Sequence, residues 1–150
     1  MDIEQSIKNS IPLSPETKTT VNILYTSSFI DEHAAPTYKE YGITAAHFNI
    51  LRILRGQKGK PANLSTIQER MIHRNSNTTR LIDKLIAKQW VTRRICPSNR
   101  RKIEVNITDL GLTKLKEIDR QVEQTAKDLF SNLTTTEMGQ LNTLLDKVRT

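Results

Sequence analysis

The sequence predicts a mainly α-helical fold with one small β-hairpin, an α+β arrangement. Apolar residues recur every three to four positions through most of the 150 residues, which is the spacing of one face of a helix. One short segment departs from this spacing. There Ile103, Val105 and Ile107 alternate with Glu104 and Asn106, which is the period of a half-buried strand. The length suits one domain or two small interdependent lobes.

The N-terminal part of the chain is predicted to form a short arm and then a helix. Pro12 and Pro15 interrupt the arm, and Ser14 before Pro15 is typical of a helix start. We expect the helix to run toward Ala35, where Pro36 should disturb it because proline has no backbone N–H to donate.

Two short helices are predicted to follow. Thr44 is the expected cap of the first, AAHFNILRIL, and the glycine- and proline-rich loop GQKGKP ends it. Ser65 and Gln68 have the spacing of a capping box. They are expected to open the second helix, STIQERM, with Ile67 and Met71 facing inward.

A third short helix has an apolar face and a basic face. Asn75 or Ser76 is expected to cap it, and it should end near Lys88. Its expected buried stripe consists of Leu81, Ile82, Leu85 and Ile86. Arg80, Lys84 and Lys88 are four positions apart, so they share a different face.

The hairpin is predicted directly after this helix. Its strands are VTRRIC and IEVNI, and the turn PSNRRK between them carries Arg100, Arg101 and Lys102 at or near its tip. Trp90, just before the first strand, is expected to anchor the hairpin in the core.

The C-terminal part of the chain is predicted to form two more helices. Thr108 should cap a long helix with an apolar seam of heptad type, formed by Leu115, Ile118, Val122, Leu129 and Leu133. Thr134 and Glu137 form a capping box for a last helix lined by Met138, Leu141, Leu144, Leu145 and Val148. Such seams around a small core need a partner, and a two-fold homodimer is the commonest solution.

Positive charge is concentrated in the third short helix and the hairpin. The chain has 23 basic and 16 acidic residues, a formal net charge of +7. Residues 70–102 hold ten of the basic residues and one acidic residue, so this segment carries +9 and the remainder −2. Such a segment is typical of a surface that binds phosphate backbones, although a solvated charged face is the common alternative.

The second and third short helices, followed by a basic hairpin, predict a winged helix-turn-helix. It is flanked here by N- and C-terminal dimerisation helices. A helix fits the major groove of double-stranded DNA, and an arginine-tipped wing fits the narrower minor groove. The expected DNA contacts are Arg74, Asn75, Ser76, Asn77, Thr79, Arg80, Lys84, Arg94, Arg100 and Arg101. Among these, Arg74, Lys84 and Arg94 are expected on phosphates, which position the protein without reading the sequence.

The chain therefore divides into three predicted parts. Residues 1–40 form the N-terminal arm and a helix that contributes to dimerisation, residues 43–110 form the DNA-binding lobe, and residues 111–150 form the C-terminal dimerisation helices. A dimer would place its two recognition helices on successive major grooves, about one DNA turn apart.

Three stretches resemble the MarR family of bacterial transcriptional regulators. NTTRLIDKLIAKQWVTR (77–93) is similar to its recognition helix, NRRKIEVNITDLG (99–111) to its wing signature, and LTTTEM (133–138) to the start of its last helix. The resemblance implies that Arg101 is the wing-tip arginine of the family, and that Thr108 and Gly111 are the threonine and glycine of the signature.

Two positions depart from the family's pattern. Asn99 stands where the wing aspartate is expected, so the support of Arg101 should be weaker or should come from a hydrogen bond. Gln89 stands where a helix-ending glycine is usual, so this cap must be made differently.

The resemblance also implies a homodimer, usually a repressor, that binds pseudo-palindromic operators and is released by a small effector, often phenolic or anionic. Tyr38, Tyr41 and His47 lie near the crevice where such effectors bind and are candidate contacts, with packing in the core or an interface as the alternative. For the whole chain, the alternative function is nonspecific nucleic-acid binding or protein interaction through the winged helix.

Other chemistries have little support in the sequence. It contains no glycine-rich phosphate loop, nucleophile–base arrangement or paired carboxylates, so an enzyme is not expected. His33, His47 and His73 are far apart, and neither a metal site nor a cofactor is expected. Cys96 lies near arginines that could activate it, but an inert thiol is the expected state.

A cytoplasmic protein without a membrane partner is predicted. No stretch approaches the roughly 18 consecutive apolar residues of a membrane span. The N-terminal residues have neither the basic nor the apolar region of a signal peptide.

Overall fold

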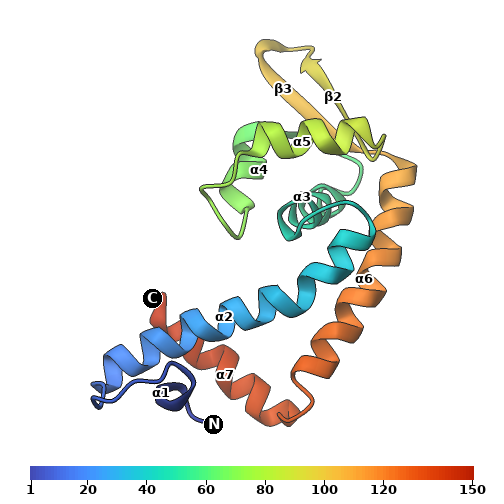
Figure 1. Cartoon of the computed structure of the whole chain (residues 1–150). Helices are drawn as coiled ribbons and strands as arrows, with labels where there is room; N and C mark the ends of the chain where they lie inside the picture. The colour runs from blue at the N-terminus through green and yellow to red at the C-terminus, as the bar shows by residue number, and fades with distance from the viewer.

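Seven helices and three strands make up the fold, and Figure 1 shows their arrangement. The computed structural model describes residues 1–150. The elements in chain order are α1 (Ile3–Ser6), α2 (Pro15–Glu40), α3 (Ala45–Gly56), β1 (Ala62–Asn63), α4 (Leu64–Arg70), α5 (Thr78–Ala87), β2 (Val91–Cys96), β3 (Asn99–Ile107), α6 (Asp109–Leu129) and α7 (Thr135–Val148). The short helices and the strands gather above the long helices α2 and α6, and α7 folds back toward α2.

α2 runs through the proline that was expected to disturb it. Ser14 caps the helix as predicted, because its side chain accepts a backbone N–H of the first turn. The helix continues past Pro36 to Glu40, so the prediction of a disturbance there was wrong. Tyr38, just after the proline, is buried against Phe48 with 5.3 Å between the ring centroids. This packing offsets the loss of one backbone hydrogen bond.

The N-terminal arm contains a single helical turn, α1, that the sequence did not predict. Asp2 caps it in a reciprocal capping box with Gln5. Lys18 on α2 donates to a Glu4 carboxylate oxygen at 3.1 Å, and Ile3 is buried. These contacts hold the arm against the start of α2.

Two of the short helices begin at caps other than those predicted. α4 is capped by Asn63, which accepts a backbone N–H at 2.8 Å, and not by Ser65. α5 is capped by Asn77, which accepts a backbone N–H at 3.2 Å, and not by Asn75 or Ser76. All of these residue types can cap a helix, so the choice depends on where the preceding chain is held. For α4, the pairing of β1 with β3 ends at Asn63.

The strands form an antiparallel sheet in the order β1-β3-β2. The predicted hairpin of β2 and β3 is confirmed, whereas β1 has only two residues and therefore shows no recognisable pattern. Ile95 pairs with Ile103, but Cys96 pairs with Asn99, so residues 100–102 have no partner in β2. The basic residues of the wing therefore lie in an irregular part of β3, next to the tip.

One hydrophobic core joins the winged helix to the ends of both flanking helices. Tyr38 of α2 and Leu115 and Ile118 of α6 belong to the same buried cluster as Leu51 of α3 and Val105 of β3. The winged helix therefore does not bury its core alone, and α2 and α6 complete it.

α5 packs on this core through the predicted stripe, and Trp90 is buried next to it as expected. Ile82 and Leu85 are buried, whereas Leu81 and Ile86 lie half-buried at the edge of the stripe. The helix ends at Ala87 with Lys88 as its C-cap, as the sequence predicts.

The last two helices leave most of their apolar residues outside the core. α6 ends at Leu129, so the predicted seam does not continue within one helix to Leu133. α7 opens with the predicted capping box of Thr134 and Glu137, yet it contains no buried residue. Between α7 and the first half of α2 lies a groove of about 690 Å³, called here the α2–α7 groove. Its apolar lining residues are Ile23, Ile30, Phe130, Met138, Leu141, Leu144, Leu145 and Val148.

The chain closes on itself where β3 passes into α6, at a contact we call the wing–helix junction (Gln89, Trp90, Thr108 and Gly111). The Thr108 hydroxyl accepts the N–H of Gly111 at 3.0 Å and donates to the carbonyl of Gln89 at 2.7 Å, while the Thr108 N–H donates to the Trp90 carbonyl at 2.9 Å. A Cβ on Gly111 would lie 2.1 Å from the Trp90 carbonyl oxygen, which is a clash. Only glycine fits at this position.

Gln89 makes the cap for which glycine is usual. Its φ of +62° lies in the left-handed region, which costs a non-glycine residue roughly 1–2 kcal/mol. Its N–H donates to the Ile86 carbonyl at 2.8 Å, and the Thr108 hydroxyl holds its own carbonyl. The hydrogen bonds of the junction therefore keep a strained residue in place.

We expect Gly111→Ala to lower the free energy of unfolding by about 1–3 kcal/mol, because the backbone must move to admit the methyl group. Gly139→Ala is the matched control, since a Cβ on this other helical glycine meets nothing within 4 Å. The control should raise stability by about 0.5–1 kcal/mol. Urea unfolding followed by circular dichroism at one protein concentration measures both. If Gly111→Ala were as stable as the wild type, the close approach of Gly111 to the Trp90 carbonyl would not be a constraint.

Candidate nucleic-acid interface

The first turn of α5 and the loop before it present most of the predicted DNA contacts to solvent. Arg74, Asn75, Asn77, Thr79 and Arg80 are exposed, and Lys84 is exposed one turn further along. Ser76 is half-buried. The structure therefore brings these side chains together around one end of the helix.

Two of these side chains also hold the local backbone. The Asn77 amide oxygen caps α5, so its NH₂ group is the part left for a ligand. The Ser76 hydroxyl donates to the His73 carbonyl at 2.8 Å and closes a turn in the loop. Their prediction as DNA contacts stays a prediction, with these structural roles beside it.

Two amide side chains that the sequence did not single out for this role fix the loop before α5. Asn49 of α3 accepts the N–H of Ile72 at 2.8 Å. Gln68 of α4 donates to the Arg74 carbonyl and accepts from the hydroxyl of the buried Thr78. No sequence pattern marks these amides, because their partners lie in other elements. They determine where the loop and the start of α5 lie.

The wing presents two exposed arginines, Arg100 and Arg101, beside its tip. Asn99 accepts the backbone N–H of Arg101 at 3.0 Å. The residue that replaces the family's aspartate thus holds the backbone of Arg101 by a hydrogen bond, which is one of the two supports expected from the sequence.

Two other arginines of the basic segment are engaged within the protein. Arg94 Nε donates to a Glu104 carboxylate oxygen at 2.8 Å, and Arg93 donates to Asp83 on α5 at 2.9 Å. The hydrogen bond from Arg94 is the main reason why the pKa of Glu104 lies below its ordinary value. Arg94 remains exposed, so its predicted phosphate contact would share the guanidinium with Glu104.

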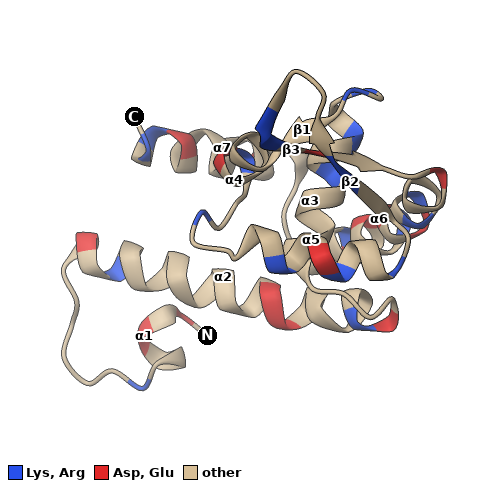
Figure 2. Ribbon diagram, turned by 90° about the horizontal axis from the view of Figure 1, so that it is seen from above, with Lys and Arg blue, Asp and Glu red and all other residues tan.

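Figure 2 looks down on this surface and shows Lys and Arg along α5 and on the wing strands. The acidic residues on these elements are Asp83 of α5 and Glu104 of β3. They form ion pairs with Arg93 and Arg94 of β2. The face therefore keeps a positive excess after its internal pairs are formed.

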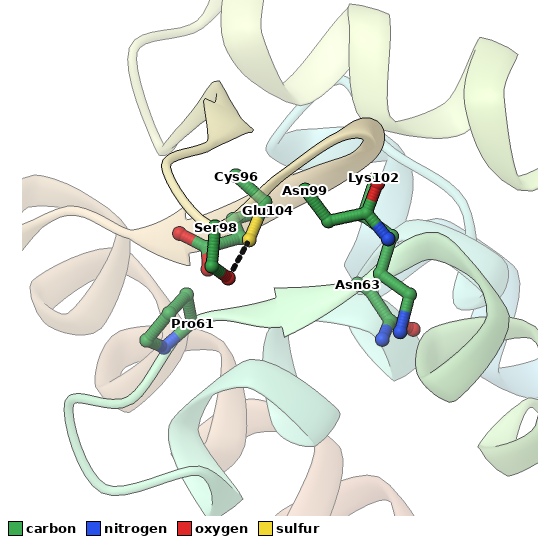
Figure 3. Close-up of a pocket in the computed structure, with 7 residues that line it drawn as sticks. All are labelled: Pro61, Asn63, Cys96, Ser98, Asn99, Lys102 and Glu104. Carbon is green, nitrogen blue, oxygen red and sulfur yellow. Dashed lines mark hydrogen bonds between the residues drawn. The ribbon is translucent and has the colours of Figure 1, made fainter.

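Beside the wing lies a polar pocket of about 380 Å³, shown in Figure 3. Its lining residues are Pro61, Asn63, Cys96, Ser98, Asn99, Lys102 and Glu104. Cys96 is buried, with 9% of the residue exposed, and its Sγ lies 3.2 Å from the Ser98 Oγ. A thiol with this little exposure fits the inert role expected from the sequence.

The three candidate effector contacts lie around the end of α2 and the start of α3. Tyr38 and His47 are buried, and Tyr41 is half-buried with its hydroxyl accepting from Gln121 Nε2 at 2.9 Å. None of the three lines the polar pocket or the α2–α7 groove. The geometry fits the packing alternative, and their contact with an effector stays a prediction.

His47 is held as a neutral ring at the start of α3. Its Nδ1 accepts the backbone N–H of Thr44 at 3.0 Å and lies 2.8 Å from the Thr44 hydroxyl oxygen, so its proton is on Nε2. Burial, with a smaller contribution from the charges of Lys84 and Lys88, lowers the pKa of His47 from 6.5 to about 4.

No three His, Cys, Asp or Glu side chains lie close enough together to hold a metal ion. None of the helices combines the length and the apolar character needed to cross a membrane.

Comparison with known sequences gives a family match within this region. Residues 43–103 match the model of the MarR family. The uncharacterized HTH-type transcriptional regulator YkoM of Bacillus subtilis is 31% identical over 120 residues, which cover 79% of this chain and 75% of the relative. The HTH-type transcriptional regulator PecS of Dickeya dadantii is 27% identical over 151 residues, which cover 98% of this chain and 90% of the relative.

Solved structures show the same fold. A cysteine-to-serine variant of MarR from Escherichia coli, complexed with operator DNA, superposes with a TM-score of 0.78 at 24% identity, over 92% of this chain and 99% of that one. BpsR of Bordetella bronchiseptica, whose DNA binding is regulated by 6-hydroxynicotinic acid, gives a TM-score of 0.80 at 22% identity, over 93% and 98% of the two chains. The predicted winged helix with flanking N- and C-terminal helices is confirmed.

We expect His47 to make the fold sensitive to acid. The folded state disfavours the protonated ring, so its contribution to stability is fully present above the unfolded pKa near 6.5 and is lost as the pH falls toward 4. Between about pH 7.5 and about pH 5, this contribution should fall by about 2 kcal/mol.

The control is His47→Gln, whose amide oxygen can still accept the Thr44 N–H but does not titrate. Urea unfolding at the two pH values should show a smaller loss for this variant than for the wild type. The same loss in both proteins would mean that another group causes the acid sensitivity.

Proposed function

The chain belongs to the MarR family of winged helix-turn-helix transcriptional regulators, and we propose that it is a sequence-specific repressor that binds a pseudo-palindromic operator as a homodimer. Regulators of this family are not enzymes, which agrees with the expectation from the sequence. A repressor acts where the DNA is, so the proposal places this chain in the cytoplasm.

The observation that carries this proposal is a pair of exposed arginines in the two elements that fit the two grooves of DNA. Arg80 lies on the first turn of α5 and Arg101 lies beside the wing tip. Neither takes part in an ion pair within the protein. Both guanidinium groups can therefore contact phosphates or base edges without first breaking an internal bond. The complex of a MarR protein with operator DNA supports the same use of this fold.

The α2–α7 groove supports the homodimer. Leu144 and Val148 are 62% and 69% exposed in the single chain, although they continue the apolar lining of the groove. A second copy that covers this apolar surface removes it from water. In this proposal residues 43–110 bind DNA, and residues 1–40 and 111–150 dimerise.

Release by a small effector is the regulatory part of the proposal. The effect of 6-hydroxynicotinic acid on BpsR supports an effector of phenolic or anionic character. Tyr38, Tyr41 and His47 are its proposed contacts. Tyr41 is the most accessible of the three, so an effector would approach from its side.

The test is a comparison of two DNA duplexes by fluorescence anisotropy at physiological salt. One contains a palindromic site selected from a random pool with this protein, and the other is a random duplex of the same length. We expect tighter binding to the selected site by roughly 10³ or more. Equal affinity for both would instead indicate a nonspecific nucleic-acid binder, and binding to neither would indicate a protein-interaction module.

We expect Arg101→Ala to weaken binding to the selected site by about tenfold and to lower the salt slope by about 1, because one cationic contact with DNA is lost. Arg120→Ala is the matched control, since it removes the same charge from an exposed position on α6, away from the wing. Its affinity and slope should match those of the wild type. Wild-type values for Arg101→Ala would show that the wing does not contact DNA.

A further inference from the structure

The last basic residue of the α5 series points to a different neighbour from the others. Arg80 and Lys84 are exposed, but Lys88, one turn further on, is half-buried. Its Nζ donates to the Tyr41 carbonyl oxygen at 3.0 Å and lies 5.1 Å from the centroid of the Trp90 ring. Both contacts are favourable to an ammonium group.

The acceptor of this hydrogen bond is the end of another helix. Tyr41 is the C-cap of α2, and the carbonyl groups at a helix C-terminus carry partial negative charge with no partner inside the helix. The next residue, Gly42, has φ of +67°, and a Cβ there would lie 2.9 Å from Lys88 Nζ. The end of α2 is therefore shaped closely around the ammonium group.

The same end of α2 is also bound to α6. The Tyr41 hydroxyl accepts from Gln121 Nε2 at 2.9 Å, so one residue bonds to α5 through its backbone and to α6 through its side chain. Figure 1 shows α5 and α2 both ending beside α6. Lys88 thus connects the recognition helix to the two long helices that flank the winged helix.

This placement does not suit a direct DNA contact. The N-terminal turn of a recognition helix reaches the base edges, and Lys88 lies at the opposite end of α5. Its ammonium is already bound to a carbonyl between elements, whereas Lys84 on the same helix is exposed and takes part in no ion pair.

We propose that Lys88 is a positioning residue that selects the spacing between operator half-sites. This inference rests on the proposed function, because it requires a homodimer on a palindrome. In a homodimer, the distance between the two recognition helices is held constant only if each α5 is firmly fixed to the dimerisation helices. The operator half-sites must have the spacing that matches this distance, so binding to operators of different spacing measures how firmly the distance is held. The bond between Lys88 and Tyr41 stiffens that connection, so the dimer rejects sites of the wrong spacing.

The experiment compares Lys88→Met with the wild type on three duplexes. One carries the selected palindrome, and the others have the same half-sites with one base pair added or removed at the centre. Methionine keeps most of the aliphatic length and packing but loses the ammonium group. We expect the preference of the wild type for the selected spacing to shrink by about tenfold in the variant, which is the loss typical of one hydrogen bond to a charged group.

Two variants separate positioning from loss of charge. Lys84→Met removes an exposed charge from the same helix, so it should weaken binding to all three duplexes equally and keep the spacing preference. Lys88→Arg keeps a cationic donor and should retain most of the preference. Thermal unfolding checks that each variant is folded, and Lys88→Gln serves as the loss variant if Lys88→Met is not.

The outcomes distinguish this inference from the function on which it rests. An unchanged spacing preference in the folded loss variant overturns the role of Lys88 and leaves the proposed function intact. A uniform loss of affinity, as in Lys84→Met, also overturns it, because Lys88 would then be a simple cationic contact. If the wild type does not prefer any palindrome over random DNA, both proposals fail together.

Discussion

The close approach of Gly111 to the Trp90 carbonyl is the constraint on which the rest of the structure depends. At this point the chain enters the wing at β2 and leaves it from β3 into α6. Thr108 forms hydrogen bonds with Gln89 and Trp90 before β2 and with Gly111 in α6. Because no side chain fits between the two segments, the start of α6 is held at a fixed place relative to the wing and the end of α5. The strained backbone of Gln89 belongs to the same arrangement, since its carbonyl is the acceptor for Thr108.

The basic segment, residues 70–102, contains two kinds of residue. Some stabilise the protein, and others remain available to a ligand. Arg93 pairs with Asp83 on α5, Arg94 pairs with Glu104 across the wing, and Lys88 binds the end of α2. Arg80 and Arg101 have no such partners and are exposed. A net charge of +9 over residues 70–102 therefore overstates the charge available to DNA, because part of it is used to position the elements that carry the rest.

The flanking helices have two different tasks along their length. Near the junction, α2 and α6 complete the buried core of the winged helix through Tyr38, Leu115 and Ile118. Farther away, α2 and α7 leave an apolar groove and α7 buries no residue. The same helix α2 thus contributes to the buried core at one end and to an exposed apolar groove at the other. At the end of α2 nearer the core, Tyr41 contacts both α5 and α6.

The sequence by itself determined the order and type of the elements other than α1 and β1, the wing, the buried stripe of α5 and the caps of α2, α6 and α7. Each of these follows from a local period or from residues three or four positions apart, which a single segment displays. Only the tertiary structure decided that α2 continues through Pro36, that Asn63 and Asn77 are the caps of α4 and α5, and which basic side chains are engaged. These outcomes depend on groups far apart in the chain, as in the contact of Lys88 with Tyr41 across 47 positions. No local pattern records such a contact, because packing alone brings the two groups together.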